Sequence, residues 1–327
     1  MEQRKPRLHN EVYPFIYPSK FKGSLKGEVA VVTGSTGTIG RAIAECFSTA
    51  GASLVLTYNR TPPSEAFRQT CLQLGAGAVT FIQCNVSNLE SCRNLIEQTE
   101  QQFEKVDILI NNAGVEGVGP MHTQDPQKLA DDIAANLHGP MYLMRFAMPS
   151  FIKTGCGCVF NIASRGGTVD MPFNSTYSTG KAALIRLTSA WQAELDIMGH
   201  RDVHLYAVHP GAVVSGLASA DALSEKLGAY PRVAEKFADM LRNFKDSPHL
   251  CGMALVALAN GVAKGVLRGR YVDVQQDLED VLSQAAALEE NPDLYKLHTS
   301  FLGGLANDGG TENAAAEKPF DFPGYAS

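Results

Sequence analysis

The stretch EVAVVTGSTGTIGRAIAECFSTAGASLVLTY, residues 28–58, decides the fold class of this chain of 327 residues. It begins with an apolar run typical of a buried strand. Residues 40–51 then place apolar side chains at helical spacing and end on a glycine that suits a helix C-cap. Residues 52–58 are again apolar and predict a second buried strand. This strand–helix–strand unit predicts an α/β fold.

The turn between the first strand and the helix, TGSTGTIG (33–40), is rich in glycine. Glycines there let the backbone turn sharply and approach a pyrophosphate, whose charge the free amides of the helix N-terminus stabilise. A tight turn can carry glycine for steric reasons alone. Its position between a buried strand and an apolar helix nevertheless favours dinucleotide binding.

The alternation of strands and helices continues toward the C-terminus, with a long helix predicted around Gln127–Phe151. Strands that are apolar throughout are buried on both faces, as in a parallel sheet covered by helices. We therefore expect a single doubly wound α/β domain with a mostly parallel seven-stranded sheet and ligands at the carboxyl ends of the strands. The further strands are predicted at residues 78–86, 107–114, 158–163, 203–211 and 269–274.

Three regions follow from this pattern: an N-terminal arm (1–24), the α/β domain (25–275) and a C-terminal extension (276–327). Prolines in the arm argue against regular secondary structure there. Residues 212–246 interrupt the alternation and would overhang the carboxyl edge of the sheet, so we interpret them as a substrate lid, with an inert loop as the alternative. The Gly- and Asn-rich end of the extension predicts a segment that is mobile or packs on a neighbouring subunit.

Composition excludes several functional classes. The net charge of −6 argues against a nucleic-acid surface, and no apolar run approaches the ~18 residues of a membrane span. The N-terminus lacks the apolar region of a secretory signal, and seven scattered cysteines fit reduced thiols, so we expect a cytoplasmic protein. Cys156 and Cys158 form an isolated C-x-C that fits a strand entry better than a metal site, and we predict no metal.

A second stretch, NIASRGGTVDMPFNSTYSTGK (161–181), carries groups that suit carbonyl chemistry. Tyr177 and Lys181 are four residues apart and therefore share one face of a helix. Ser164 follows a short apolar run that predicts a strand. Taken singly, these residues fit a core tyrosine, a surface lysine and an ordinary loop serine. Together with the nucleotide turn, they predict a proton-donating site.

The end of the second strand indicates which dinucleotide binds. An acidic residue about 20 positions after the glycine turn would bind an adenosine ribose and repel a 2′-phosphate. This region instead reads Thr57-Tyr58-Asn59-Arg60, without an acid. Arg60 can pair with a phosphate, and Ser35 or Thr36 can add hydroxyls, which favours NADP(H) over NAD(H). The alternative for Arg60 is a solvated surface charge.

Further motifs are NNAG at 111–114, Asn136 and Pro210-Gly211. Together with TGSTGTIG at 33–40, Ser164 and the Tyr-x-x-x-Lys of Tyr177 and Lys181, they resemble the short-chain dehydrogenases/reductases over about Leu25–Val274. The resemblance implies a Rossmann-type fold. The flanking segments are also similar to a filamentous-fungal subgroup with unassigned or secondary-metabolic roles.

The resemblance implies a role for each residue of a catalytic set. Tyr177 would donate a proton to a carbonyl during reduction, or accept one during alcohol oxidation. Lys181 would bind the nicotinamide ribose and lower the pKa of the tyrosine, and Ser164 would bind the substrate oxygen. Asn136 would hold a water that links Lys181 to solvent.

The resemblance also implies the cofactor contacts. The glycine turn would cradle the pyrophosphate, NNAG would line the cleft, and the segment after Pro210 would flank the nicotinamide. Three positions depart from the family pattern: Thr38 replaces a glycine, Asn85 replaces an acid, and Gly180 replaces a serine and suggests a close backbone approach. The predicted contacts are Gly34, Ser35, Thr36, Thr38, Ile39, Gly40, Tyr58, Asn59, Arg60, Asn85, Val86, Asn112, Ala113, Gly114, Tyr177, Lys181, Pro210, Gly211, Val213 and Ser215.

The resulting hypothesis is an NADP(H)-dependent oxidoreductase, a ketoreductase that reduces a ketone or oxidises the matching secondary alcohol by hydride transfer. Alternatives are an imine reductase or cyclisation-guiding biosynthetic enzyme, and a non-catalytic NADP(H)-binding regulatory protein. Met171, Phe173 and residues 212–246 are expected to shape a mainly apolar pocket. Arg165 is interpreted as either a contact for a substrate carboxylate or a surface charge.

The expected partner is a small carbonyl or alcohol substrate, without nucleic acid or membrane. Members of the family pair through the helix that bears the tyrosine. Leu184, Leu187 and Trp191 on that helix are therefore candidates for an interface, and we expect a homodimer or homotetramer.

Overall fold

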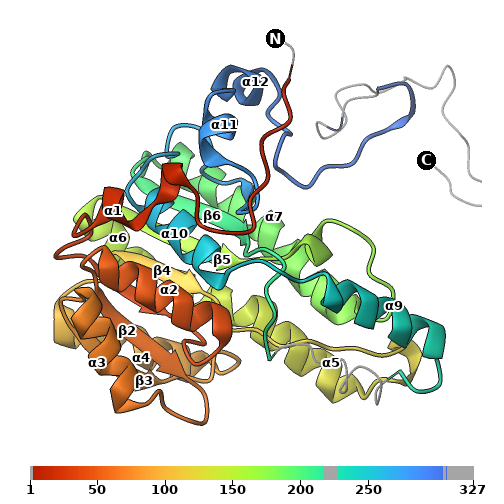
Figure 1. Ribbon diagram of the computed structural model, residues 1–327, viewed down its shortest axis with the longest axis horizontal. Helices are drawn as coiled ribbons and strands as arrows, with labels where there is room; N and C mark the ends of the chain where they lie inside the picture. Colours follow the sequence, from red (N-terminus) through yellow and green to blue (C-terminus); the bar gives the residue numbers. More distant parts are fainter. Residues whose placement is uncertain (1–2, 217–226, 305–306, 308–327) are drawn as a thin grey trace, which may run out of the picture. The chain divides into compact units, whose positions relative to one another are not determined.

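The computed structural model describes residues 3–216, 227–304 and 307. Its centre is one sheet of seven parallel strands in the order β3-β2-β1-β4-β5-β6-β7, which confirms the predicted fold class (Figure 1). Residues up to Lys296 belong to one compact unit, and those from Leu297 on belong to a second. The strands are β1 (Val29–Val32), β2 (Ser53–Tyr58), β3 (Val79–Gln83), β4 (Ile108–Asn111), β5 (Gly157–Ile162), β6 (Val203–His209) and β7 (Tyr271–Asp273).

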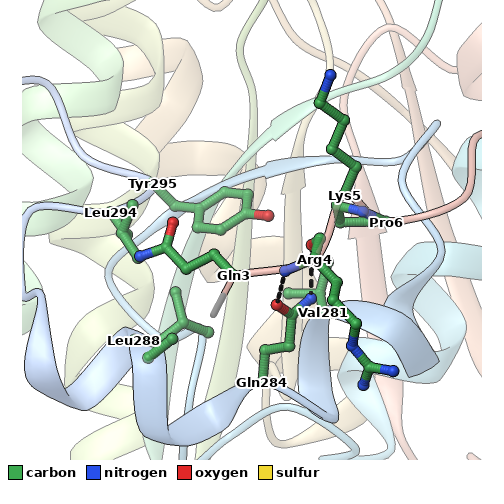
Figure 2. Close-up of a pocket in the computed structure, with 10 residues that line it drawn as sticks. Gln3, Arg4, Lys5, Pro6, Val281, Gln284, Leu288, Leu294 and Tyr295 are labelled. Carbon is green, nitrogen blue, oxygen red and sulfur yellow. Dashed lines mark hydrogen bonds between the residues drawn. The ribbon is translucent and has the colours of Figure 1, made fainter. Parts of the chain in front are cut away.

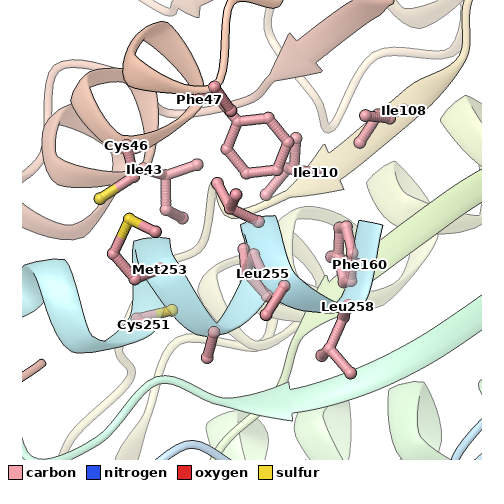
Figure 3. Close-up of a cluster of buried hydrophobic side chains, with 14 of the residues drawn as sticks. Ile43, Cys46, Phe47, Ile108, Ile110, Phe160, Cys251, Met253, Leu255 and Leu258 are labelled. Atoms are coloured by element: carbon pink, nitrogen blue, oxygen red, sulfur yellow. The ribbon is translucent and has the colours of Figure 1, made fainter. Parts of the chain in front are cut away.

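Helices cover both faces of the sheet, as the uniformly apolar strands require. Alternate strand residues feed two separate cores: Val32 and Phe160 pack with the helices of one face, and Val31 and Val159 with those of the other. Figure 3 shows the first core, where α2 and α10 pack against each other over the strands. The first face carries α2 (Thr38–Thr49), α3 (Glu65–Leu74) and α10 (Pro248–Ala259), and the second carries α4 (Leu89–Phe103), α6 (Gly139–Thr154) and α7 (Ser175–Ile197).

The long helix predicted around Gln127–Phe151 is interrupted. It consists of α5 (Pro126–Ile133), a π-helical turn at Ala134–His138, and α6. Pro140 has no amide hydrogen to donate to the carbonyl four residues earlier, and the Gly139 amide instead donates to the carbonyl of Ala134, five residues back. The widened turn bears Asn136.

The N-terminal arm holds more regular structure than its prolines predict. A 3₁₀ turn at Pro14–Ile16 and the short helix α1 (Pro18–Phe21) each begin at a proline. The prediction failed because proline is tolerated at the first helical position, where its missing amide hydrogen would have no partner. The other 3₁₀ turns are Met121–Thr123, Arg165–Gly167 and Leu302–Gly304.

The arm packs on the first part of the C-terminal extension, which forms α11 (Leu278–Leu282) and α12 (Ala285–Glu290). The Gln284 side chain accepts from the Arg4 amide at 2.7 Å and donates to the Arg4 carbonyl at 2.9 Å. Figure 2 shows these two bonds beside a pocket of about 480 Å³, with Leu288 and Tyr295 among its lining residues. The two ends of the α/β domain are therefore held together.

Asp277 is the centre of this attachment. Its buried carboxylate accepts from the amides of Glu279 and Asp280 at the start of α11. It also lies 2.7 Å from His9 Nε2 and 3.2 Å from an Arg7 nitrogen. One side chain thus caps the helix and binds the arm.

We expect Asp277→Ala to lower the free energy of unfolding by about 2 kcal/mol, because the cap and the contact with His9 are lost together. Urea denaturation measures the change. Glu279→Ala is the control, since its exposed carboxylate lies 3.9 Å from Arg7, and a change within about 0.5 kcal/mol is expected. Equal losses in the two variants would contradict the assignment.

The predicted lid segment, 212–246, is only partly described, because residues 217–226 lie outside the described residues. Its helix α9 (Pro231–Arg242) belongs to a small apolar cluster with Val118, Leu227 and Phe173, separate from the two main cores. The Tyr230 and Phe173 rings lie 5.0 Å apart. Among the residues that the structure describes, none of the helices has the length and apolar character needed to span a membrane.

Candidate active site

The glycine turn after β1 is shaped by steric limits that only glycine meets. Gly34 has φ +63°, and a Cβ added to it would lie 2.9 Å from Ala113 Cα. A Cβ on Gly40 would overlap the Gly34 carbonyl oxygen and lie 2.9 Å from Asn112 Nδ2. Thr38 begins α2 and is exposed, so its side chain is not forced into the turn. The two glycines therefore allow the turn to pack closely against Ala113 and Asn112. The turn leads into the N-terminus of α2, where free amides suit a diphosphate.

The NNAG segment after β4 is tied to this turn. Thr33 Oγ1 accepts from the amides of Asn112 at 2.9 Å and Ala113 at 3.0 Å. The Asn112 side-chain amide donates to the carbonyls of Thr33 at 2.9 Å and Gly34 at 3.1 Å. Asn112 thus fixes the distance between two adjacent strand ends.

A cavity of about 430 Å³ opens along the carboxyl ends of the strands, within the size range of small-molecule and cofactor sites. It extends from the glycine turn to Tyr177 and Lys181. The glycine turn lines this cavity and leads into the N-terminus of α2, whose free backbone amides suit the diphosphate of a dinucleotide. Predicted cofactor contacts that line it are Gly34, Thr36, Thr38, Ile39, Gly40, Asn59, Asn85, Val86, Asn112, Ala113, Gly114, Tyr177, Lys181, Pro210 and Ser215.

Five predicted contacts do not line this cavity, although the structure describes all of them: Ser35, Tyr58, Arg60, Gly211 and Val213. Ser35 is buried beneath the turn and donates to the Thr57 carbonyl at 2.9 Å. Other lining residues were not predicted from the sequence. They flank predicted residues in the chain, at the strand ends or, for Ala135, on the π-helical turn, and this proximity was the available signal. They are Gly37, Cys84, Ser87, Val115, Ala135, Ile162, Ala163 and Gly216.

Ser164 and Tyr177 are brought together from the end of β5 and the first turn of α7. Ser164 Oγ accepts from the Gly166 amide at 3.0 Å. Burial raises the pKa of the Tyr177 phenol, a hydrogen bond with Ser164 opposes this, and the Glu116 carboxylate adds to the increase. The phenol is therefore protonated at neutral pH and able to donate a proton.

Lys181 is buried one helical turn after Tyr177. Its ammonium donates to the Ile162 carbonyl at 2.7 Å and lies 5.6 Å from the centre of the Tyr177 ring. Burial lowers its pKa to about 8. Lys181 therefore places a positive charge beside the phenol at neutral pH, although burial makes the ammonium easier to deprotonate than in water.

Asn136, on the π-helical turn, is fully buried. Its side chain accepts from the Val115 amide at 3.2 Å and donates to the carbonyls of Val115 at 2.9 Å and Asp132 at 3.0 Å. A Cβ on Gly180 would lie 3.0 Å from Asn136 Cβ. The glycine that departs from the family pattern therefore allows α7 to approach this helix closely.

Arg165 has a structural partner. Its guanidinium donates to Asp273 Oδ2 at 2.7 Å and to Gln275 Oε1 at 2.5 Å, which ties the loop after β5 to the end of β7. His209 accepts from the Arg165 amide at 3.4 Å, and burial lowers its pKa to about 4, so it is neutral at pH 7. The exposed Arg165 side chain therefore agrees with the surface-charge interpretation, and it forms an ion pair with Asp273.

Two loops meet near Tyr177. The Asn174 side-chain amide donates from Nδ2 to Glu116 Oε1 at 2.9 Å, and the Gly119 backbone amide donates to the Phe173 carbonyl at 2.9 Å. Phe173 has φ +68°, a conformation that is rare for a bulky residue. The predicted pocket residue Phe173 is thus held firmly beneath α9, whereas Met171 lies near Gly166, whose added Cβ would be 2.7 Å from the Met171 sulfur.

The sequence matches the short chain dehydrogenase family over residues 28–226. It is 32% identical over 280 residues to a short chain dehydrogenase of Pseudocercospora fijiensis, covering 84% of this chain and 88% of that protein. A short chain dehydrogenase of Monascus purpureus, mpl6, is 30% identical over 285 residues (85% and 90%). The 11-beta-hydroxysteroid dehydrogenase-like protein 4A of Arabidopsis thaliana is 30% identical over 215 residues (65% and 70%).

Proposed function

The chain belongs to the short-chain dehydrogenase family of oxidoreductases, which use a nicotinamide cofactor, and we propose that it is an NADP(H)-dependent ketone reductase. The observation that carries the proposal is the position of the proton-donating group at one end of the cofactor cavity. A phenol hydrogen-bonded to a serine hydroxyl, with a buried ammonium one turn away, lies at one end of the cofactor cavity. This arrangement suits protonation of a carbonyl oxygen.

Each residue of the site has a separate role in the proposed reaction. Ser164 and Tyr177 bind the substrate oxygen, and the raised pKa of Tyr177 keeps its proton available for transfer. The Lys181 ammonium stabilises the phenolate that remains. Asn136 holds the wall of the cleft through both polar groups of Val115. The bound cofactor supplies the hydride, and in the reverse direction the same residues accept the proton of a secondary alcohol.

The experiment that tests this function follows NADPH consumption by absorbance with a panel of ketones and cyclic imines. Turnover of ketones supports the proposal, and turnover restricted to imines supports the alternative of an imine reductase or cyclisation-guiding enzyme. NADPH binding without turnover of any member would favour a non-catalytic regulatory protein. The fungal short chain dehydrogenases among its relatives motivate the choice of secondary-metabolic ketones for the panel.

For the cofactor, we propose that Arg60 binds the 2′-phosphate of NADP(H). It is exposed and follows the carboxyl end of β2, next to Asn59, which lines the cavity. Arg60→Ala should weaken NADPH binding about tenfold or more and leave NADH binding within about twofold, because one charged hydrogen-bonding partner is lost. Fluorescence titration measures both affinities. Arg145→Ala, which removes an exposed arginine on α6, is the control. An equal effect of Arg60→Ala on both cofactors would contradict the role of Arg60.

We also propose that residues 212–246 form a lid over an apolar substrate pocket. Support comes from the cluster that α9 makes with Val118 and Phe173, which is small and separate from the main cores.

For assembly, we propose a homodimer or homotetramer that uses the α7 face near Leu187 and Trp191, both only partly buried. Leu184 is fully buried and belongs to the hydrophobic core of the chain, so it is not available for an interface.

We propose the same three regions that the sequence predicts: an arm (1–24), the α/β domain (25–275) and an extension (276–327). A reducing, cytoplasmic location is proposed from the cysteines. All seven are free, and six of them are buried. Such thiols persist where disulfides do not form.

A further inference from the structure

A buried carboxylate lies next to the proposed site without touching the reacting groups. Asp132, on the last turn of α5, is 2% exposed. Its Oδ1 lies 2.8 Å from the ammonium of Lys128, one turn earlier on the same helix. Its Oδ2 accepts from Thr176 Oγ1 at 3.1 Å. Thr176 is buried and directly precedes Tyr177.

Asp132 is also joined to the other two segments of the site. Its backbone carbonyl accepts from the Asn136 side chain at 3.0 Å. The loop that carries Val115 and Glu116 comes so close that a Cβ on Gly117 would overlap Asp132 Oδ2 and lie 2.6 Å from Thr176 Oγ1. One residue therefore contacts the loop after β4, the turn that bears Asn136, and the start of the tyrosine helix.

Packing alone does not account for a carboxylate here. The ion pair with Lys128, whose side chain is 45% exposed, contributes little net stability. The first turn of α7 has no side-chain cap of its own, since Asn174 makes no capping hydrogen bond. A negative charge near that turn is favoured by its free amides. The Asp132–Thr176 bond is thus placed to hold the turn that presents the phenol.

We propose that Asp132 and Thr176 are positioning residues, whose hydrogen bond sets the place of Tyr177 relative to Ser164. This inference rests on the proposed function, in which Tyr177 donates the proton. Loss of the bond should lower kcat rather than cofactor affinity, because the cofactor cavity is lined by other residues. Small misplacements of reacting groups have large effects on rate.

The principal test is Thr176→Val, which replaces the hydroxyl by a methyl group of similar size. We expect kcat to fall about tenfold and the Kd of NADPH to stay within about twofold. Thr176→Ser, which keeps the hydroxyl, should restore most of the rate. Thr179→Val, on the exposed side of the same helix, is the matched control and should leave kcat unchanged. An unchanged kcat in Thr176→Val would overturn the proposal.

A double-mutant cycle separates positioning from general destabilisation. If Thr176 acts through Tyr177, then Thr176→Val should cause no further loss in the Tyr177→Phe background, whereas an equal tenfold loss in both backgrounds would overturn the proposal. Asp132→Asn and Asp132→Ala provide a second pair, because the amide oxygen of asparagine can still accept from Thr176. Asp132→Asn should retain most of the rate that Asp132→Ala loses, and equal losses would contradict the hydrogen bond as the cause.

Failure of this inference can be told from failure of the proposed function. If the wild-type protein turns over no carbonyl substrate, the ketone reductase fails, and positioning is then read from amide hydrogen exchange in residues 175–181. Thr176→Val should accelerate exchange there at least about threefold relative to Thr179→Val. Equal exchange in the two variants would overturn the positioning role.

Discussion

Tyr177→Phe is expected to lower kcat for carbonyl reduction by about a thousandfold. The substitution removes only the phenolic oxygen, so the ring still fills its place over the Lys181 ammonium, 5.6 Å from the ring centre. The proton that the carbonyl oxygen must gain then has no donor at the end of β5. Ser164 remains, but its hydroxyl is suited to binding the substrate oxygen and not to supplying the proton.

Steady-state kinetics with NADPH and a ketone identified from the panel measure this change. The Kd of NADPH should stay within about twofold, since most of the cavity lining is unaltered. Tyr142→Phe is the matched control: Tyr142 is a partly buried tyrosine on α6 that packs against His138, and its hydroxyl has no assigned role. Full turnover by Tyr177→Phe would contradict proton donation by Tyr177, whatever the substrate.

Much of the fold could be predicted from local pattern. Apolar runs, helical spacing and capping glycines placed the seven strands close to their observed bounds, because each signal lies within one short segment. The interrupted helix was missed for the opposite reason. The spacing of apolar residues runs on through Ala134–His138, and only Pro140 signals that the hydrogen-bond ladder changes there.

The site shows the same limit. Three of the residues that the resemblance assigns to chemistry lie at a strand end (Ser164) or on one helix face (Tyr177 and Lys181), where spacing in the chain translates directly into geometry. Contacts between segments that are distant in the chain have no corresponding signal in the local sequence. Arg165 and Asp273 are 108 residues apart, and Asp132 and Thr176 are 44 apart. Nothing in either local sequence indicates its partner, so the ion pair and the positioning bond became visible only in the folded chain.

Lys181→Met is expected to reduce turnover at least about a hundredfold, because the positive charge that stabilises the Tyr177 phenolate is removed. The same substitution should not destabilise the protein at neutral pH. Burial lowers the pKa of Lys181 from 10.5 to about 8. A depression of this size corresponds to a cost of about 3 kcal/mol for keeping the ammonium charged in the folded state.

The sign of the pH dependence follows from proton binding. Between pH 8 and 10.5 the unfolded chain holds a proton on Lys181 that the folded chain has released, so the cost is fully present below pH 8 and disappears as the pH approaches 10.5. Methionine removes this cost but also removes the donor to the Ile162 carbonyl, a loss of about 1–3 kcal/mol. Lys181→Met should therefore be at least as stable as wild type at pH 7 and less stable near pH 10.

Urea denaturation at several pH values measures the difference in unfolding free energy between variant and wild type, which should shift by about 3 kcal/mol from pH 7 to 10.5. Lys153→Met, which removes an exposed ammonium on α6, is the comparison. A variant that loses activity while keeping or gaining stability identifies a residue retained for function, since a purely structural lysine would show the reverse. If Lys181→Met is strongly destabilised at pH 7, the ammonium is a structural element of the β5–α7 junction and its proposed role beside Tyr177 is wrong.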